Sequence, residues 1–436
     1  MTATGGPDAR RILRFWTPLA ATWLMMAVEG PFLAAVIARL GDPEIQLAAY
    51  GVAFAFALIL EAPVIMMMSA STALVKDRES FFELRRFTIG LNGVLTAGMG
   101  VLLLPPVFRV VVRQGIGLPG DVADVTWHTL LLLLPWPGAI GYRRFYQGIL
   151  IAADMTRRVA YGTVARITTM ASTALALALT APEMGGARVA AVALSAGVVA
   201  EALATRAMAA GATRRVRKLP GGERLGLRRL AVFYVPLALT SILGLGVQPV
   251  VTFFVGHARE ALASLAVLPV VSALVFVFRA LGLAYQEVVI ALAGEDLDGV
   301  PALRRFGTVL AIALSTALAA IALTPLAGVW FRGVSGLTPE LAALARVPAM
   351  VLVPIPALTV WLCLERGILV ARRRTAAVTW ATAIEVTVIV AVLWIATVPL
   401  DMVGAVAAAA ALLAGRTAST LWLARRDEVS GSVAGS

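Results

Sequence analysis

Long uninterrupted apolar segments recur along the whole chain, and they limit the folds open to it. Runs such as Leu130–Leu134 and Ala405–Ala414 show no alternation of apolar and polar residues, so they predict helices rather than the strands of a β-barrel. A helix needs about 20 apolar residues to cross a bilayer. The chain therefore predicts an all-α integral membrane fold with about twelve transmembrane helices. We place these helices at residues 13–38, 47–75, 87–112, 126–151, 159–182, 188–210, 231–256, 261–292, 306–331, 341–369, 376–398 and 402–424.

The composition agrees with a membrane protein. Of 436 residues, 60% are hydrophobic and 14% are charged, whereas soluble proteins have roughly 45–50% apolar and about 25% charged residues. The net charge of +12 could indicate nucleic-acid binding, but the arginines gather in one set of loops, as membrane insertion requires. We therefore expect no nucleic-acid partner. The first apolar run is long and has no small-residue cleavage site, so we expect it to remain as the first helix.

The sequence also contains an internal duplication whose copies meet at a basic segment with a Leu-Pro-Gly-Gly turn. Phe15–Ala20 matches Phe233–Ala238, Pro31 matches Pro249, Pro135–Pro137 matches Pro354–Pro356, and Gln147–Leu150 matches Arg366–Leu369. Four matches in one register indicate a repeat. We therefore predict an N-terminal six-helix bundle at residues 1–210 and a C-terminal six-helix bundle at 231–424. A basic cytoplasmic linker at 211–230 joins them, and a short cytoplasmic tail follows at 425–436.

Arginine and lysine are concentrated in alternate loops, which predicts the orientation of the chain. The basic side carries Arg10, Arg11, Arg14, Lys76, Arg78, Arg85, Arg86, Arg157, Arg158, Arg304, Arg305, Arg372–Arg374, Arg425 and Arg426, together with the linker. By the positive-inside rule, both termini and the linker are cytoplasmic, so we expect a multi-pass protein of a bacterial-type inner membrane. An even number of helices in each half makes the two repeats parallel, and the cleft between such bundles is the expected substrate site.

Several kinds of active site are excluded by residues that are missing. The single cysteine, Cys363, rules out an intramolecular disulfide, and with two distant histidines it argues against a zinc site. Neither Lys76 nor Lys218 follows a glycine, so there is no Walker A phosphate loop. No zinc-protease motif is present. We expect no enzymatic activity, metal or cofactor, and we expect any energy to come from a coupled H⁺ or Na⁺ gradient.

Charged residues inside the predicted spans are the candidate site, because each costs about 2.5–3.5 kcal/mol on insertion scales. They either pair with one another inside the bundles or line a watery cavity, and pairing is the stronger interpretation for Arg416, Glu201 and Arg144. Several arginines facing one cavity would suit an anion. The candidate substrate-binding residues are Arg143, Gln147, Arg166, Gln248, Arg279 and Arg366. The candidate ion-coupling residues are Glu29, Glu61, Glu287 and Glu385.

Prolines mark the candidate hinges. In Glu29-Gly30-Pro31 the proline removes a backbone donor and frees the carbonyl of Ala27, so a carboxylate lies beside a predicted kink. The matching segment, Gln248-Pro249, keeps the proline but has no titratable group. This asymmetry makes Glu29 the first candidate for a coupling site. The full set of predicted hinge or kink residues is Pro31, Pro249, Pro135, Pro137, Pro354 and Pro356.

These motifs together resemble a known superfamily. Two parallel six-helix repeats, each with an aromatic residue two positions before Pro-Leu-Ala, resemble the flippase superfamily that includes the multidrug and toxin extrusion (MATE) transporters. Within it, Arg14–Leu19 and Leu47–Ala53, the latter followed by Pro63, resemble the progressive ankylosis (ANK) family, in which Glu29 falls on a glutamate. The resemblance covers nearly the whole chain. It implies a MATE-like fold and export of small organic anions such as citrate, pyrophosphate or nucleotides.

The function predicted from the sequence is secondary active export of a small organic anion by alternating access through a central cleft. A first alternative is a proton- or sodium-coupled efflux antiporter for cationic drugs, in which Glu29, Glu61 and Glu385 would bind the cation and the ion in turn. A second alternative is a flippase for a lipid-linked substrate. We expect membrane lipid and a small-molecule substrate as partners, and a monomer.

Overall fold

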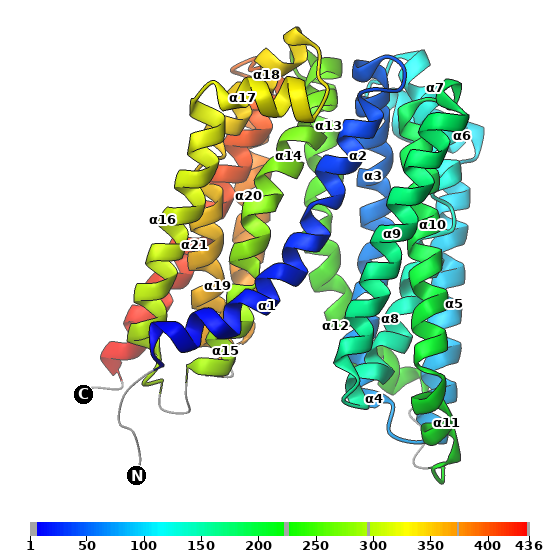
Figure 1. Cartoon of the computed structure of the whole chain (residues 1–436), viewed down its shortest axis with the longest axis vertical. Coiled ribbons are helices and arrows are strands. Elements are labelled where there is room, and N and C mark those ends of the chain that lie inside the picture. Colours follow the sequence, from blue (N-terminus) through cyan, green and yellow to red (C-terminus); the bar gives the residue numbers. More distant parts are fainter. Residues whose placement is uncertain (1–6, 222–225, 294–296, 373–374, 434–436) are drawn as a thin grey trace. The chain divides into compact units, whose positions relative to one another are not determined.

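The computed structural model describes residues 7–221, 226–293, 297–372 and 375–433, and this part of the chain is almost entirely helical (Figure 1). The helices of the first half are α1 (Ala9–Ala27), α2 (Glu29–Ile37), α3 (Pro43–Ile65), α4 (Met67–Leu74), α5 (Arg78–Leu102), α6 (Pro105–Phe108), the π-helix η1 (Arg109–Gln114), α7 (Gly120–Leu132), α8 (Trp136–Ala152), α9 (Thr156–Thr180), the 3-10 helix η2 (Pro182–Met184), α10 (Gly186–Met208) and α11 (Ala210–Lys218). Those of the second half are α12 (Leu227–Leu245), α13 (Val247–Gly256), α14 (Ala261–Leu283), α15 (Tyr285–Leu292), α16 (Val300–Leu323), α17 (Leu326–Gly328), the π-helix η3 (Val329–Val334), α18 (Pro339–Val351), α19 (Ile355–Ala371), α20 (Thr375–Thr397) and α21 (Gly404–Val433).

The helices are those of a multi-pass membrane protein. Within the described residues, 9 helices are long and apolar enough to cross a membrane, or 10 if the pair Arg78–Leu102 and Pro105–Gln114, bent by 72°, counts as one span. Large apolar side chains such as Leu179 (75% exposed) and Val309 (69%) lie on the surface, where a bilayer rather than water would surround them favourably. The predicted all-α membrane fold is confirmed, whereas the count of twelve spans is not. The predicted spans at 126–151 and 231–256 are not among the helices that qualify.

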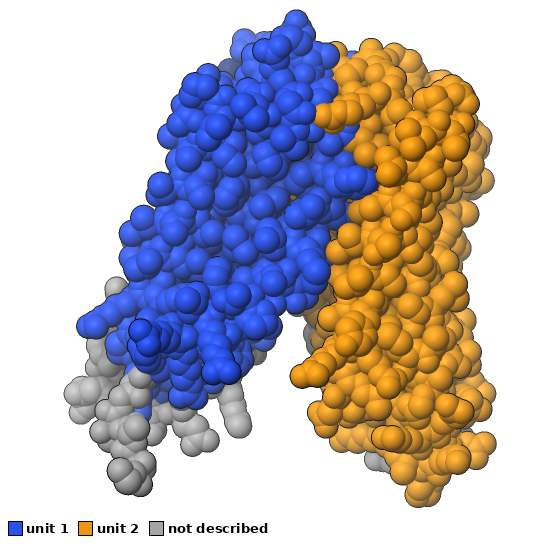
Figure 2. Space-filling model, viewed as in Figure 1, with its two compact units in different colours: residues 1–35, 257–436 blue, residues 36–256 orange. Residues whose placement is uncertain are grey.

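The chain folds into two compact units (Figure 2), and their boundaries differ from those of the sequence repeat. Unit 1 comprises Met1–Ala35 and His257–Ser436, and unit 2 comprises Val36–Gly256. Within unit 1, α1 packs on α14 and α15, and the Trp16 indole N–H donates to the carbonyl of Leu281 at 3.1 Å. Within unit 2, α12 packs on α3, and the Tyr234 hydroxyl donates to the carbonyl of Pro63. The first helix of each half therefore packs with the helices of the other half.

The internal repeat extends to the lengths of individual helices. α3 and α14 have 23 residues each, and α4 and α15 have 8 each. Both pairs share an offset of 218 residues, from 43 to 261 and from 67 to 285. α8 and α19 have 17 residues each, with an offset of 219, from 136 to 355. The π-helical segments η1 and η3 also correspond, with 6 residues each. The short motifs therefore belong to a longer repeat, in which helices of the first half correspond in length to helices of the second half.

The helix breaks repeat in the same register. α1 gives way to α2 at Val28, three residues before Pro31, and α12 gives way to α13 at Gly246, three residues before Pro249. A proline cannot donate to the carbonyl four residues back, and its ring crowds that turn, which accounts for a break on its N-terminal side. The α3–α4 break at Met66 and the α14–α15 break at Ala284 also correspond, although only the first has a nearby proline, Pro63.

The predicted linker is partly helical. α11 ends at Lys218, with Arg215, Arg217 and Lys218 in its last turn, where cations interact favourably with the helix dipole. Leu219-Pro220-Gly221 then stops the helix. α12 begins at Leu227, inside the predicted linker range of 211–230, and residues 222–225 lie outside the described residues. α11 and α12 therefore extend into the predicted linker range from its two sides.

A repeated glycine lets α8 and α19 approach their neighbours closely. A Cβ atom added at Gly148 would lie 2.5 Å from the Met68 carbonyl oxygen and 2.6 Å from the Ser71 Cβ. At the matching Gly367 it would lie 2.7 Å from the Val289 Cβ. Both glycines thus occupy helix crossings, α8 on α4 and α19 on α15, that leave no room for a side chain.

We predict that Gly148→Ala lowers the free energy of unfolding by about 1–3 kcal/mol, because the methyl group forces α8 away from α4. The check is the thermal unfolding midpoint of the purified protein in detergent. The matched control is Gly93→Ala, since a Cβ added there meets nothing within 4 Å and alanine favours a helix. Equal midpoints for both variants would show that the crossing is looser than described.

Candidate functional site

Unit 2 contains a buried cluster centred on the carboxylate of Glu201 on α10. The Arg143 guanidinium on α8 forms an ion pair with Glu201 Oε2, and Gln147, one turn further along α8, donates to Oε1 at 3.1 Å. Arg166 Nε, on α9, lies 3.6 Å from Oε2. The side chains of Arg143 and Glu201 are only 7% and 1% exposed. Two helices thus direct polar groups at one acid on a third helix, which offsets the cost of burying them.

A second carboxylate, Glu61 on α3, lies in the same unit. Trp136 is the first residue of α8, and its indole N–H donates a hydrogen bond to Glu61 Oε2 at 2.9 Å. Glu61 is buried, and the charges of Arg143, Arg144 and Arg166 act on it. The unit 2 cluster therefore sets two carboxylates against three guanidinium groups, and most of its charge is neutralised internally.

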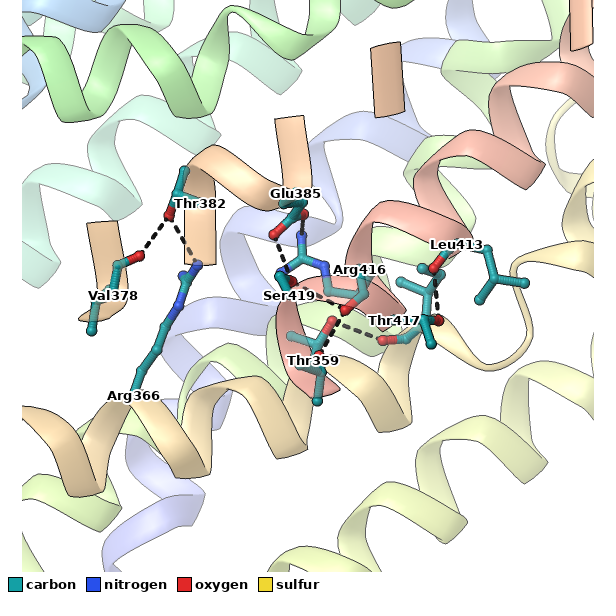
Figure 3. A network of polar contacts seen from close by, with 11 residues as sticks. Thr359, Arg366, Val378, Thr382, Glu385, Leu413, Arg416, Thr417 and Ser419 are labelled. Atoms are coloured by element: carbon teal, nitrogen blue, oxygen red, sulfur yellow. Dashed lines mark hydrogen bonds and ion pairs between the residues drawn. The ribbon is translucent and has the colours of Figure 1, made fainter. Parts of the chain in front are cut away.

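Unit 1 contains a second polar cluster, on α19, α20 and α21 (Figure 3). Arg416 Nη2 lies 2.9 Å from Glu385 Oε1, and the Ser419 hydroxyl donates to Glu385 Oε2 at 3.1 Å. Arg366 Nη2 donates to the hydroxyl of Thr382 at 3.3 Å. Thr382 and Glu385 are three residues apart on α20, so they present adjacent acceptors on one face of that helix.

Arg279 on α14 adds a further cation to the unit 1 cluster. Its guanidinium carbon lies 5.9 Å from the centre of the Phe276 ring, and the charges of Arg366, Glu385 and Arg416 act on it. In the described part of the chain, Nε of Arg279 and Nε of Arg366 are buried without a hydrogen-bond partner. The charges of three guanidinium groups thus combine with that of Glu385 in this cluster, and buried Nε atoms without a partner also occur at Arg143 and Arg144 in unit 2.

The two clusters occupy repeat-related positions with altered charge. Glu61 in unit 2 corresponds to Arg279 in unit 1 at the offset of 218 residues that relates α3 to α14. Arg166 corresponds to Glu385 at an offset of 219, so two positions carry opposite charge. Gln147 corresponds to Arg366, and Glu201, the central acid of unit 2, corresponds to Ser419. The duplication thus placed polar groups at the same sites, but only unit 2 kept two acids.

The remaining predicted ionisable or polar candidates differ in how far they are exposed. Glu29 is the first residue of α2, directly after the α1–α2 break, and is half-buried. Glu287 is exposed on α15, and Gln248 is exposed on α13, where its backbone carbonyl accepts from Thr252 at 3.0 Å. The structure therefore brings Arg143, Gln147 and Arg166 together in one unit and Arg279, Arg366 and Glu385 in the other.

The predicted hinge prolines lie at helix starts or close after helix breaks. Pro31 and Pro249 lie three residues after the breaks described above. Pro135 precedes α8 and Pro137 is in its first turn, while Pro354 precedes α19 and Pro356 is in its first turn. A proline is compatible with a helix start, where its missing N–H is not needed. Whether any of them acts as a hinge stays a prediction.

Sequence reasoning treated Glu201 and Arg416 chiefly as structural charges, and the structure places both in ion pairs. It did not identify Ser419, Thr382 or Trp136 as partners, because hydroxyl and indole groups are common in membrane helices. The repeat offset was the available signal, since it aligns Ser419 with Glu201. Among the described residues, no group of three or more His, Cys, Asp or Glu could hold a metal ion.

Comparison with solved structures identifies the fold. An inward-facing multidrug-resistance MATE family transporter of the MOP superfamily matches with a TM-score of 0.71 and 13% identity, over 95% of this chain and 98% of that chain. The lipid II flippase MurJ in an inward closed conformation matches with a TM-score of 0.72 and 13% identity, over 94% and 88%. A MOP superfamily transporter from Pyrococcus furiosus, described as having a binding pocket of reverse polarity, matches with a TM-score of 0.62 and 14% identity, over 95% of both chains.

No protein-family model matches the chain, and no curated protein matches it by sequence. At 13–14% identity the structural matches establish the fold and leave the substrate to chemical argument. The chain has the MATE-type membrane transporter fold.

We predict that Glu201→Ala destabilises the protein by about 3–5 kcal/mol, because Arg143 and Arg166 then lose their shared buried counter-ion. Unfolding in mixed micelles measures the change. The control is Asp124→Ala, which removes a pair with Arg113 whose side chains are 66% and 41% exposed, so that about 0–1 kcal/mol is expected. A Glu201 variant as stable as this control would contradict a structural role for the unit 2 cluster.

Proposed function

We propose that the protein is a secondary active transporter that exports a small organic anion by alternating access, with the unit 1 cluster as the anion-binding site. The observation that carries this proposal is the charge imbalance in unit 1, where Arg279, Arg366 and Arg416 share the one carboxylate of Glu385. Arginine inside a membrane is costly unless it is paired. An anionic substrate would supply the missing acceptors, and the planar guanidinium groups suit carboxylate or phosphate oxygens.

The accessibility of the two clusters supports the same assignment. In unit 2 the central pair is almost completely enclosed, with Glu201 only 1% exposed. In unit 1, Arg279 and Arg366 are only partly buried, and the Arg416 and Glu385 side chains keep 15% and 13% of their surface. A transported ligand has to enter and leave, so the more open cluster, which also has the larger excess of guanidinium groups over carboxylates, is the better candidate. The enclosed unit 2 cluster then serves to hold α8, α9 and α10 together.

The substrate class agrees with the export of citrate, pyrophosphate or nucleotides implied by the resemblance to the ANK family, and the coupling ion is proposed to be H⁺ or Na⁺ at Glu29. Two other functions occur on this fold, as the solved structures of a multidrug transporter and of a lipid II flippase illustrate. Cationic drug efflux would favour a site dominated by carboxylates, and the unit 1 cluster has the opposite composition. Flipping of a lipid diphosphate would also use arginines, so a fluorescent lipid diphosphate is one of the substrates tested below.

We predict that Arg279→Ala reduces anion transport about tenfold or more, since a charge-assisted hydrogen bond contributes roughly 1.5–3 kcal/mol. The measurement is flux of labelled citrate, pyrophosphate and ATP in proteoliposomes, with ethidium as the cationic contrast. Arg279→Glu, which copies Glu61 of the other repeat, should abolish anion flux. The control is Arg332→Ala, an exposed arginine of the same unit, which should transport normally.

Three results would overturn the proposal. Ethidium flux that is lost in Glu29→Gln, without any anion flux, would make the protein a cationic drug exporter. Translocation of a fluorescent lipid diphosphate without flux of the free anions would make it a flippase. Normal anion flux in both Arg279 variants would move the anion site away from unit 1.

A further inference from the structure

Unit 2 has a groove between the first half of α5 and the start of α12, separate from both charged clusters. Its volume is about 600 Å³, and it is lined by Glu83, Arg86, Phe87, Gly90, Leu91, Val94, Gly226 and Leu230. The α5 members recur every three or four residues, so they form one face of that helix. The volume falls in the range of about 300–1,000 Å³ that is usual for ligand sites.

The groove changes character along its length. The part further from the basic start of α5 is formed by Gly90, Leu91 and Val94. Val94 is 69% exposed, and a Cβ atom added at Gly90 would meet nothing within 4 Å. Phe87 closes one wall, with its ring 5.2 Å from that of Tyr234 on α12. This part is an open apolar groove on α5, which belongs to the bent pair of apolar helices described above.

The other end of the groove is polar. Glu83 Oε2 accepts the Gly226 N–H at 3.2 Å, which ties the start of α12 to α5. Arg86 lines this end and is exposed, and Arg228, also exposed, lies two residues beyond Gly226. Lys76 and Arg78 are close by in sequence, so this end belongs to the basic side of the protein. Basic residues at a membrane surface attract anionic lipid headgroups.

We propose that this groove binds one acyl chain of an anionic glycerophospholipid, with the lipid phosphate at Arg86. An apolar channel that opens to the bilayer and ends at an arginine is complementary to such a lipid in both shape and charge. The site is independent of the transported substrate. Bound there, the lipid bridges α5 and α12 beside the Gly226–Glu83 hydrogen bond, and it stabilises the packing of α12 in unit 2.

Native mass spectrometry of the full-length protein in detergent tests the proposal, with phosphatidylglycerol and phosphatidylcholine of identical acyl chains as probes. We expect Gly90→Trp, whose indole fills the channel, to weaken phosphatidylglycerol binding about tenfold. The matched control is Gly93→Trp, because a Cβ at Gly93 also meets nothing within 4 Å and this residue is not in the lining of the groove. It should bind the lipid like the unmodified protein.

A second pair of variants tests the headgroup contact. Arg86→Gln should remove the preference for phosphatidylglycerol over phosphatidylcholine, while Arg78→Gln, an exposed cation outside the lining, should keep it. Equal binding of the two lipids by the unmodified protein would overturn the assignment of the phosphate to Arg86. Unchanged binding in Gly90→Trp, or an equal loss in Gly93→Trp, would show that the lipid associates with the general surface and not with the groove.

Discussion

The structure depends on how buried guanidinium groups are neutralised within apolar helices. Each charge placed in a span has to recover about 2.5–3.5 kcal/mol on insertion scales, and in this chain that recovery comes from pairing between helices. In unit 2, Arg143 of α8 and Arg166 of α9 both form ion pairs with Oε2 of Glu201 on α10. Leucine contacts with lipid and with protein are similar in strength, so apolar packing alone would specify these helix positions weakly. The shared acid gives α8, α9 and α10 a definite register.

Duplication supplied two copies of this framework. The equal lengths of α3 and α14, of α4 and α15, and of α8 and α19 show that backbone geometry was kept while side chains diverged. Glycine at the tight helix crossings and proline after the helix breaks are backbone constraints, so they persist in both copies. Charged positions are not constrained in this way, because an ion pair can be reversed or moved to a neighbouring helix without a change in helix length.

The same distinction explains what could be predicted from the sequence. The length of the apolar runs predicts membrane helices, and Pro31 and Pro249 predict helix breaks, because both depend on local chemistry. The number of spans does not follow from hydropathy in the same way, since α8 carries Arg143, Arg144 and Gln147 and is not among the helices that qualify as spans. The packing of α1 with α14, and of α12 with α3, could not be read from the repeat, because a duplicated sequence does not say which copy a helix packs against. Pairing partners such as Ser419 depend on side chains that are far apart in sequence.

The two copies are therefore alike in backbone and different in electrostatic balance, and the proposed anion site depends on this difference. A site that neutralises all of its own charge offers a ligand nothing, while a site with unpaired charge is costly until the ligand arrives. Unit 1 has Ser419 where unit 2 has Glu201, and Arg279 where unit 2 has Glu61, so unit 1 is closer to the second condition than unit 2. Unit 2 keeps the stable arrangement. In the function proposed above, unit 1 would carry the cost of a binding site, and unit 2 would not.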